Sequence, residues 1–373
     1  MENEHLIVKI NPNGTFSLFS KGNKKLYENL HFFTDNGEVG SAHISKKPQR
    51  NQTYTSLGSA AQITMIVSNL LRGIYRIDLK MSIPASASLD GSDRLREMME
   101  LPIIYWLILE KGGKYLKIKT RLYNKARDHK LCINFPTGIY TDFSTPESAF
   151  AVEKRRVRYT QTGDNFESFH PFQPMQNFVD VNDSKIGLAF LSKGLREYEV
   201  MDDKERTLAI TLIRTHRDYM TANTDMTPEE FDKYKGLHSF GDMEYNYALY
   251  PHTGEWDSGE VLQAAYQYKV DIKAIQGVPI KGELLAIGSF LSIQPSGKIM
   301  LSALKRSEDG KGIVMRMWNT TSNRQNVTVA TTLPIKSVKC LLLDEIPVAD
   351  MSFSEGKIKF EIGPHKIETI LLA

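Results

Sequence analysis

Histidine, cysteine and carboxylate side chains most often perform catalysis or bind metals, so their spacing indicates what chemistry a chain can support. Nine histidines occur in the 373 residues, and none forms an HExxH or His-x-His pattern. The two cysteines, Cys132 and Cys340, lie far apart without a CxxC pair. The spacing therefore supplies no zinc signature, and a single long-range disulfide is the only covalent link available to these cysteines.

Nucleophile and phosphate motifs are also missing. The sequence has no Gly-x-Ser-x-Gly elbow, no GxxxxGK[ST] loop and no dinucleotide fingerprint. Carboxylates are plentiful, and a glycosidase needs two of them about 5 to 9 Å apart across the scissile bond. Sequence spacing alone identifies no such pair in a chain rich in strands.

One segment, Tyr247–Trp256, combines aromatic residues with a histidine and a glutamate directly after a proline turn. Aromatic faces stack on sugar C–H groups and carboxylates accept sugar hydroxyls, so the segment could line a carbohydrate surface. The alternative, which the residue types favour, is that Tyr250 and Trp256 pack at a corner while His252 satisfies a turn carbonyl.

The composition is that of an ordinary globular protein, with 41% hydrophobic and 24% charged residues. Lys and Arg number 47 against 44 Asp and Glu, so no global field recruits nucleic acid or a membrane surface. The first residues lack the basic and apolar regions of a signal peptide, and no apolar run is long enough to span a bilayer. We expect a cytoplasmic protein without nucleic-acid or membrane partners.

The elements that must position any site are strands. Two β-rich runs, 105–109 and 115–119, flank Gly112-Gly113 and predict a hairpin. The same pattern predicts strands over four further segments: 188–191, 208–213, 266–272 and 357–362.

Helix signals are few. Thr227 with Pro228 and Glu230 forms a capping box that predicts a short helix over 227–234, and a weaker signal covers 94–100. Glycine and proline near 277–282 predict a boundary between residues 1–277 and residues 278–373. The expected fold class is all-β, with a large sandwich followed by a small one.

Several segments, taken in order, resemble the C-terminal half of glycoside hydrolase family 38 α-mannosidases, in particular the bacterial, mannosylglycerate-hydrolase-like branch. The resemblance covers nearly the whole chain and is carried by these stretches: 11–15, 29–40, 176–181, 194–200, 208–214, 247–256, 301–305 and 362–372. It implies a β-supersandwich of the galactose-mutarotase-like type followed by a small β-sandwich. It also implies that the zinc ion, its ligands and the aspartate nucleophile belong to an N-terminal half that this sequence does not contain.

The resemblance further implies that one segment of this half reaches the sugar pocket. The family pattern Asp-x-Gly-x-x-Gly-Asp-Glu-Tyr is matched at Asp35 and the two following glycines, after which Ser41-Ala42-His43 replaces Asp-Glu-Tyr. Asp35, Glu38 and His43 are therefore the expected pocket-rim residues, where a histidine is shorter than a tyrosine and titratable. No catalytic residue, metal ligand or cofactor is expected within this chain.

Three functions remain open from the sequence. The leading hypothesis is a C-terminal portion of an α-mannosidase, inactive alone, which binds α-mannosides together with a separate catalytic half and self-associates, most simply as a dimer. The alternatives are a stand-alone carbohydrate-binding or structural module and a mutarotase-like epimerase. An epimerase would need a histidine acid and a glutamate base that face each other on the concave sheet.

Overall fold

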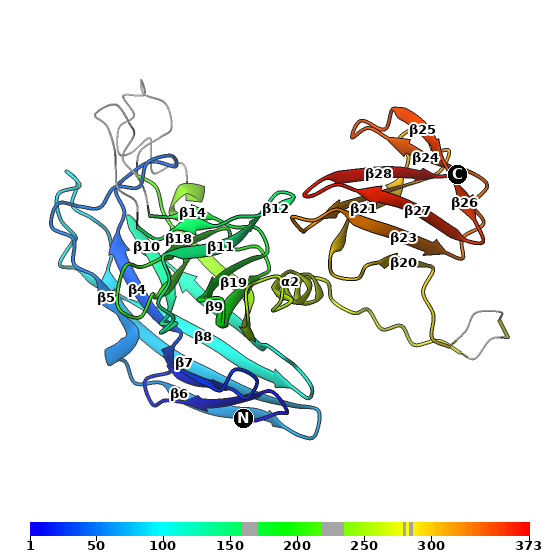
Figure 1. Ribbon diagram of the computed structural model, residues 1–373. Helices are drawn as coiled ribbons and strands as arrows, with labels where there is room; N and C mark the ends of the chain where they lie inside the picture. The colour runs from blue at the N-terminus through cyan, green and yellow to red at the C-terminus, as the bar shows by residue number, and fades with distance from the viewer. Residues whose placement is uncertain (159–170, 218–234, 279–280, 283–285) are drawn as a thin grey trace. The chain divides into compact units, whose positions relative to one another are not determined.

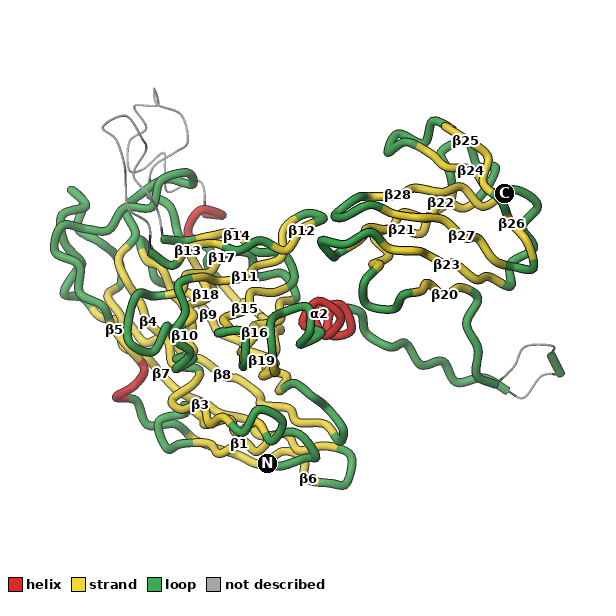
Figure 2. The backbone as a smooth tube through the Cα atoms, in the orientation of Figure 1, coloured by secondary structure: helices red, strands yellow, loops and turns green. Residues whose placement is uncertain are grey.

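The computed structural model of the chain describes residues 1–158, 171–217, 235–278, 281–282 and 286–373 (Figure 1). Strands make up nearly all of the regular structure in these residues. The exceptions are one α-helix and two short 3-10 turns: α2 (Val261–Lys269), η1 (Ser56–Gly58) and η2 (Lys235–His238) (Figure 2). The expected all-β sandwich fold class is confirmed.

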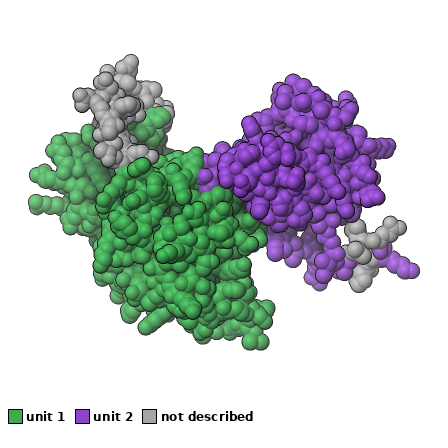
Figure 3. Space-filling model, in the orientation of Figure 1, with its two compact units in different colours: residues 1–147, 153–270 green, residues 148–152, 271–373 purple. Residues whose placement is uncertain are grey.

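Two compact units divide the chain (Figure 3). The first comprises residues 1–147 and 153–270, and the second comprises residues 148–152 and 271–373. The proline- and glycine-containing stretch 277–282 thus belongs to the second unit, close to its start. The domain boundary expected from the sequence, at 277/278, stays a prediction.

The first unit is built from three antiparallel sheets. A three-stranded sheet has the order β1 (Leu6–Ile10), β2 (Phe16–Ser20), β3 (Lys25–Leu30). A six-stranded sheet has the order β14 (Gln173–Pro174), β17 (Glu197–Val200), β18 (Leu208–Arg214), β10 (His129–Phe135), β4 (Phe32–Gly37), β5 (Tyr54–Thr55). A third, larger sheet has the order β11 (Phe143–Ser148), β15 (Phe178–Asn182), β16 (Ile186–Ser192), β19 (Gly241–Thr253), β9 (Leu116–Asn124), β8 (Met98–Glu110), β7 (Arg72–Pro84), β6 (Gln62–Ser68), with β13 (Arg155–Arg156) paired to β11. The short strand β12 (Ala151–Val152) belongs to the second unit.

The period of two predicts which face of each strand is buried. Along β8, Leu101, Ile103, Tyr105, Leu107 and Leu109 are buried and alternate with half-buried residues. Side chains from all three sheets join these residues in one hydrophobic core. The predicted hairpin is confirmed as β8 and β9, which pair in antiparallel register with Leu107 opposite Ile118.

The second unit is a small sandwich of two antiparallel sheets. One sheet has the order β20 (Leu291–Gln294), β23 (Gln325–Thr331), β27 (Lys357–Ile362), β26 (Phe353–Ser354). The other has the order β21 (Ile299–Arg306), β22 (Ile313–Asn319), β28 (Ile367–Leu372), β24 (Val338–Leu341), β25 (Pro347–Met351). A separate core joins them, with Met315, Val329 and Ile370 fully buried at its centre. The predicted strand over 357–362 is confirmed as β27.

Two predictions of secondary structure are wrong. The segment 266–272 is not a strand, because residues up to Lys269 form the end of α2, which buries Val261, Leu262, Ala264, Ala265 and Tyr268. The spacing of these buried residues is that of a helix whose apolar face begins at Val261, before the alternating stretch 266–272. Packing of this face determines the structure, so the alternation in 266–272 does not produce a strand. The segment 94–100 is not a helix, since Met98 begins β8 and Arg94 lies buried in a bridge-and-turn region. The predicted helix over 227–234 lies outside the described residues.

His31 is buried among the aromatic side chains of the first unit's core. It has φ of 69° at the junction of β3 and β4, and its ring lies 4.2 Å from the ring of Tyr105. Its Nε2 lies 2.7 Å from the hydroxyl of Tyr247, which also contacts Thr120. Burial lowers the pKa of His31 to about 3, because the charged imidazolium would lose its hydration.

This low pKa predicts a pH-dependent stability. Below about pH 6.5 the unfolded chain binds a proton at His31 that the folded chain excludes, so the free energy of unfolding decreases as the pH falls toward 3. The slope from one such group approaches about 1.4 kcal/mol per pH unit. We expect urea unfolding between pH 7 and 4.5 to show this decrease and His31→Gln to remove it, whereas the exposed control His43→Gln leaves it in place. An identical pH dependence in His31→Gln and the native protein would contradict the assignment.

Candidate functional site

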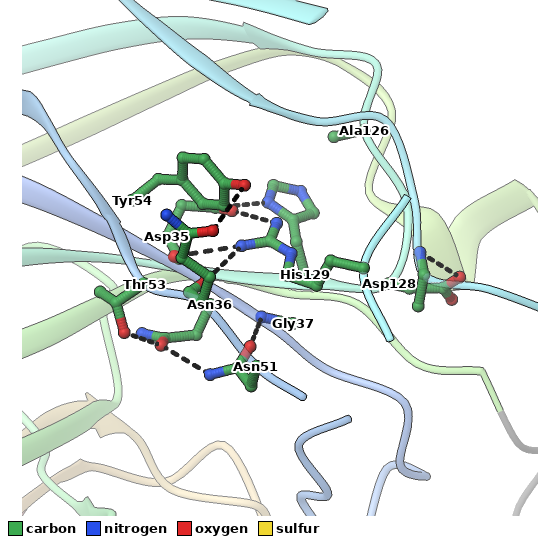
Figure 4. A network of polar contacts seen from close by, with 12 residues as sticks. Asp35, Asn36, Gly37, Asn51, Thr53, Tyr54, Ala126, Asp128 and His129 are labelled. Carbon is green, nitrogen blue, oxygen red and sulfur yellow. Dashed lines mark hydrogen bonds and ion pairs between the residues drawn. The ribbon is translucent and has the colours of Figure 1, made fainter. Parts of the chain in front are cut away.

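The carboxylate of Asp35 lies at the centre of a buried polar cluster near the end of β4 (Figure 4). Its side chain is 0% exposed and forms an ion pair with Arg94, whose side chain is 3% exposed. Its second oxygen lies 2.6 Å from Nδ1 of His129, which is also fully buried. Asp35 therefore satisfies two neighbours at once, one from the segment before β8 and one from β10.

The arginine of this cluster has further partners that fix its plane. Arg94 donates Nη1 to the backbone carbonyls of Asp35 and Gln52, at 3.2 and 3.3 Å. Its guanidinium lies 5.1 Å from the centre of the Tyr54 ring. A buried ion pair is retained only when such additional contacts offset the loss of hydration. The cluster is thus a geometric anchor that ties β4, β5 and the start of β8 together.

Next to this anchor, a second set of hydrogen bonds fixes the end of β4. The amide oxygen of Asn36 accepts from Thr53 at 2.6 Å and from Asn51 at 3.1 Å (Figure 4). The amide oxygen of Asn51 in turn accepts from the backbone N–H of Gly37 at 2.8 Å. The hydrogen bonds of Asn36 and Gly37 to residues 51–53, together with the contacts of Asp35, therefore fix the backbone where the chain leaves β4.

Glu38 organises the loop that follows, residues 38–46, from the inside. Its side chain is buried, and Oε1 accepts from the backbone N–H groups of Gly40 at 3.0 Å and Lys46 at 2.8 Å. The hydroxyl of Ser45 donates to its other oxygen. A carboxylate that accepts several hydrogen bonds closes the loop on itself, so Glu38 acts as a structural centre and does not reach solvent.

His43 lies at the tip of this loop and is exposed. The backbone on which it stands is held from a neighbouring strand, because Arg214 of β18 donates to the carbonyls of Ser41 at 3.0 Å and Ala42 at 2.7 Å. Arg217 adds a backbone hydrogen bond to Gly40 at 2.9 Å. Of the three residues expected at a pocket rim, only His43 presents its side chain to solvent, while Asp35 and Glu38 support it from within.

Sequence reasoning missed the residues that complete this site. Arg94, His129 and Arg214 stand 59, 94 and about 170 positions from their partners on β4 and the loop. No spacing rule connects residues so distant. The available signal was that Arg94 and His129 lie next to or within segments rich in strand-forming residues. Sequence alone cannot tell whether such charged side chains are buried or exposed.

A second polar cluster lies on the face of the six-stranded sheet that carries Glu197 and Glu199. Glu197 pairs with Lys130 at 2.8 Å and accepts from Thr211 at 2.8 Å. Burial raises the pKa of Glu199, which would suit a general base.

The epimerase alternative also needs a histidine acid. The histidine–carboxylate ion pairs seen within the described residues, His129 with Asp35 and His252 with Asp180, are buried. Neither gives the exposed acid–base pair that an epimerase needs.

The Tyr247–Trp256 segment is mostly internal. Tyr247 is fully buried in the core, and the hydroxyl of Tyr250 donates to the carbonyl of Gly259 at 2.9 Å. Nε2 of His252 lies 2.9 Å from Asp180. The predicted packing role of Tyr250 is confirmed, but the main partner of His252 is a carboxylate and not a turn carbonyl.

The described residues do not fit a zinc ion. Among them, no group of three or more His, Cys, Asp or Glu side chains is placed to hold a metal ion. Both cysteines are free, and burial raises the pKa of each thiol to about 11. We therefore derive no metal-dependent step from this chain. No helix in the described part of the chain is long and apolar enough to cross a membrane.

Comparison with known families identifies the chain. Residues 1–218 match the family described as glycosyl hydrolases family 38 C-terminal domain, and residues 298–370 match the glycosyl hydrolases family 38 C-terminal beta sandwich domain. The first match alone covers more than half of the 373 residues. The chain belongs to glycoside hydrolase family 38, as a C-terminal region of that family.

Individual relatives agree with this assignment. A Halalkalibacterium halodurans protein provisionally named a mannosylglycerate hydrolase is 26% identical over 384 residues, which cover 99% of this chain and 41% of the relative. Human α-mannosidase 2C1 is 21% identical over 93% of this chain and 29% of its own length. The crystal structure of an Enterococcus faecalis α-mannosidase matches with a TM-score of 0.86 at 25% identity, over 100% of this chain and 42% of that one. The chain spans well under half the length of these relatives.

The buried anchor gives a direct test by mutation. Asp35→Asn keeps the shape of the side chain but leaves the Arg94 charge buried without a counter-charge, which costs about 3 to 5 kcal/mol of unfolding free energy. The matched control is Asp78→Asn, since Asp78 pairs with Arg76 at 2.6 Å on the surface, where the cost is about 0 to 1 kcal/mol. Urea unfolding of both variants measures the difference. Equal destabilisation by the two substitutions would show that Asp35 is no anchor.

Proposed function

We propose that this chain completes an α-mannosidase whose catalytic half is supplied by other residues. The observation that carries the proposal is the match of the entire chain to 42% of an Enterococcus faecalis α-mannosidase at a TM-score of 0.86. The missing part would supply the zinc ion, its ligands and the aspartate nucleophile implied by the family resemblance. Residues 1–277 and 278–373 would be its two C-terminal domains, and the enzyme would hydrolyse α-mannosides in the cytoplasm.

Within that enzyme, the described residues have a positioning role. Loop 38–46 is closed by Glu38, held by Arg214 and anchored through Asp35, so its tip is presented with little freedom. A rim of a sugar pocket requires such rigidity, because a misplaced contact to a substrate hydroxyl loses most of its value. His43 is the loop residue that can donate to or accept from a substrate hydroxyl at this rim.

The chain alone is expected to be inactive. The purified protein should not turn over an aryl α-mannoside with or without added zinc, because a positioned nucleophile and acid are needed to stabilise the transition state. Zinc-dependent turnover that persists through further purification would contradict the proposal.

The role of the rim is tested in an assembled complex with the catalytic half of the Enterococcus faecalis relative. There, His43→Tyr restores the residue type of the family pattern and should raise or restore mannosidase activity. The control His365→Tyr changes another exposed histidine, in the second unit, and should have no effect. Equal activity of the His43→Tyr and native complexes would contradict the proposal that His43 lies at the pocket rim.

We further propose that the chain self-associates as a dimer through the edge strand β6. Its residues 62–68 carry no charge, and Met65 and Ile66 are 58% and 51% exposed. Leu70 and Leu71, in the turn after β6, are also exposed. A long, apolar edge strand presents unpaired N–H and C=O groups that can pair with another strand. A second copy of β6, paired antiparallel, opposes no like charges and covers the same apolar side chains.

Light scattering of the purified chain at micromolar concentrations should therefore report a dimer. Met65→Lys places a charge in the centre of the interface and should yield a monomer. The control Leu89→Lys alters an isolated apolar residue that is 90% exposed and should leave the dimer intact. A monomeric native chain, or a dimer that persists in Met65→Lys, would contradict this interface.

A further inference from the structure

A cavity of about 260 Å³ lies in the first unit, apart from loop 38–46. Residues from β1 and β2, the turn after β2, the β8–β9 turn and the end of β19 with the turn that follows it line its wall. The residues with polar side chains in this lining are His5, Ser20, Asn23, Lys114, Tyr250, His252, Thr253, Ser258 and Glu260. Nothing in the proposed mannosidase role uses this cavity.

One wall of the cavity is rigid. The His252 ring is held by Asp180, which itself accepts from Asn182 at 2.7 Å. Glycines stand on both sides of the ring, since a Cβ on Gly187 or Gly259 would lie 2.2 or 2.3 Å from it. Burial alone would lower the pKa of His252, but the neighbouring Asp180 charge outweighs burial and raises it. The imidazole is therefore fixed in place before any ligand arrives.

Other groups at the cavity have unused hydrogen-bonding capacity. Ser20 is 4% exposed, and within the described residues its hydroxyl makes no hydrogen bond. The ring of His5 likewise has no hydrogen-bond partner in the described part of the chain. Asn23 is already committed, since it donates to the carbonyl of His252 at 3.0 Å. Two of the side chains that remain available to a ligand are thus Ser20 and His5, and Lys114 and Glu260 line the same cavity.

The charges and the size of the cavity limit the class of ligand. Lys114 and Glu260 lie 3.8 Å apart and are both exposed, so they hold each other weakly and contribute no net charge. A neutral ligand that both donates and accepts fits this pair better than an anion. At about 30 Å³ per water, the volume corresponds to roughly nine waters, below the about 300 Å³ at which drug-sized pockets begin. This volume suits a single sugar ring.

We propose that this cavity is a binding site for one neutral monosaccharide unit, separate from the rim at His43. Hydroxyl groups of the sugar accept from Lys114, donate to Glu260 and exchange hydrogen bonds with Ser20 and His5. The site lies wholly in the first unit, so its occupancy does not require the catalytic half.

Saturation-transfer NMR on the isolated chain, with methyl α-D-mannopyranoside as the probe, tests the proposal. We expect a saturable signal with a dissociation constant on the order of 1 mM. Ser20→Val, which removes the unpaired hydroxyl and narrows the cavity at its wall, should abolish the signal, and Glu260→Gln should weaken binding about three- to tenfold through the lost charged hydrogen bond. The controls are Ser17→Val, on the other face of β2, and Glu28→Gln, an exposed glutamate of β3, and both should bind as the native chain does.

The outcomes separate this site from the proposed enzyme role. Binding that is kept in His43→Tyr and lost in Ser20→Val supports a second site, whether or not the assembled complex hydrolyses mannosides. The absence of saturable transfer would overturn the proposal, as would loss of binding in His43→Tyr alone. Tighter binding of glycerate or inorganic phosphate than of the methyl mannoside would overturn the neutral-sugar assignment.

Discussion

A carboxylate that is fully removed from water must be matched by partners, and the buried charge of Asp35 imposes this requirement on the first unit. Arg94 and His129 meet that requirement from two different parts of the chain. The position of β4 relative to β10 and the start of β8 is thereby fixed. Loop 38–46 follows β4 directly, so the position of β4 also determines where the loop begins. The strand cannot shift without separating the buried ion pair between Asp35 and Arg94.

The loop then adds its own constraints. Glu38 draws two backbone N–H groups and a serine hydroxyl around one carboxylate, and Arg214 holds the tip by two carbonyls. The result is a segment with buried charges inside and one exposed imidazole outside. A similar arrangement recurs at the cavity, where Asp180 fixes His252 and leaves the neighbouring polar groups to meet a ligand. In both places, a buried aspartate–histidine pair provides rigidity and other residues face solvent.

Local patterns predicted the strands but not the site. Over 105–119 and 357–362, residues on the buried face of each strand alternate with residues on the other face. A short window of sequence is therefore sufficient to predict these strands. The alternation at 266–272 misled because only a longer window shows the helical period of α2. The family resemblance pointed to Asp35, Glu38 and His43. It could not reveal that the two carboxylates are buried, because their partners come from residues remote in sequence and burial is a property of the assembled sheets.

We conclude that the buried Asp35 charge holds loop 38–46 in place. Amide hydrogen–deuterium exchange in Asp35→Asn and in the native chain tests it most directly, because exchange reports local opening segment by segment. We expect amides of residues 38–46 to exchange at least about tenfold faster in the variant, while strands β20 to β28 of the second unit keep their native rates. Unchanged exchange in loop 38–46 of a folded Asp35→Asn protein would contradict the claim.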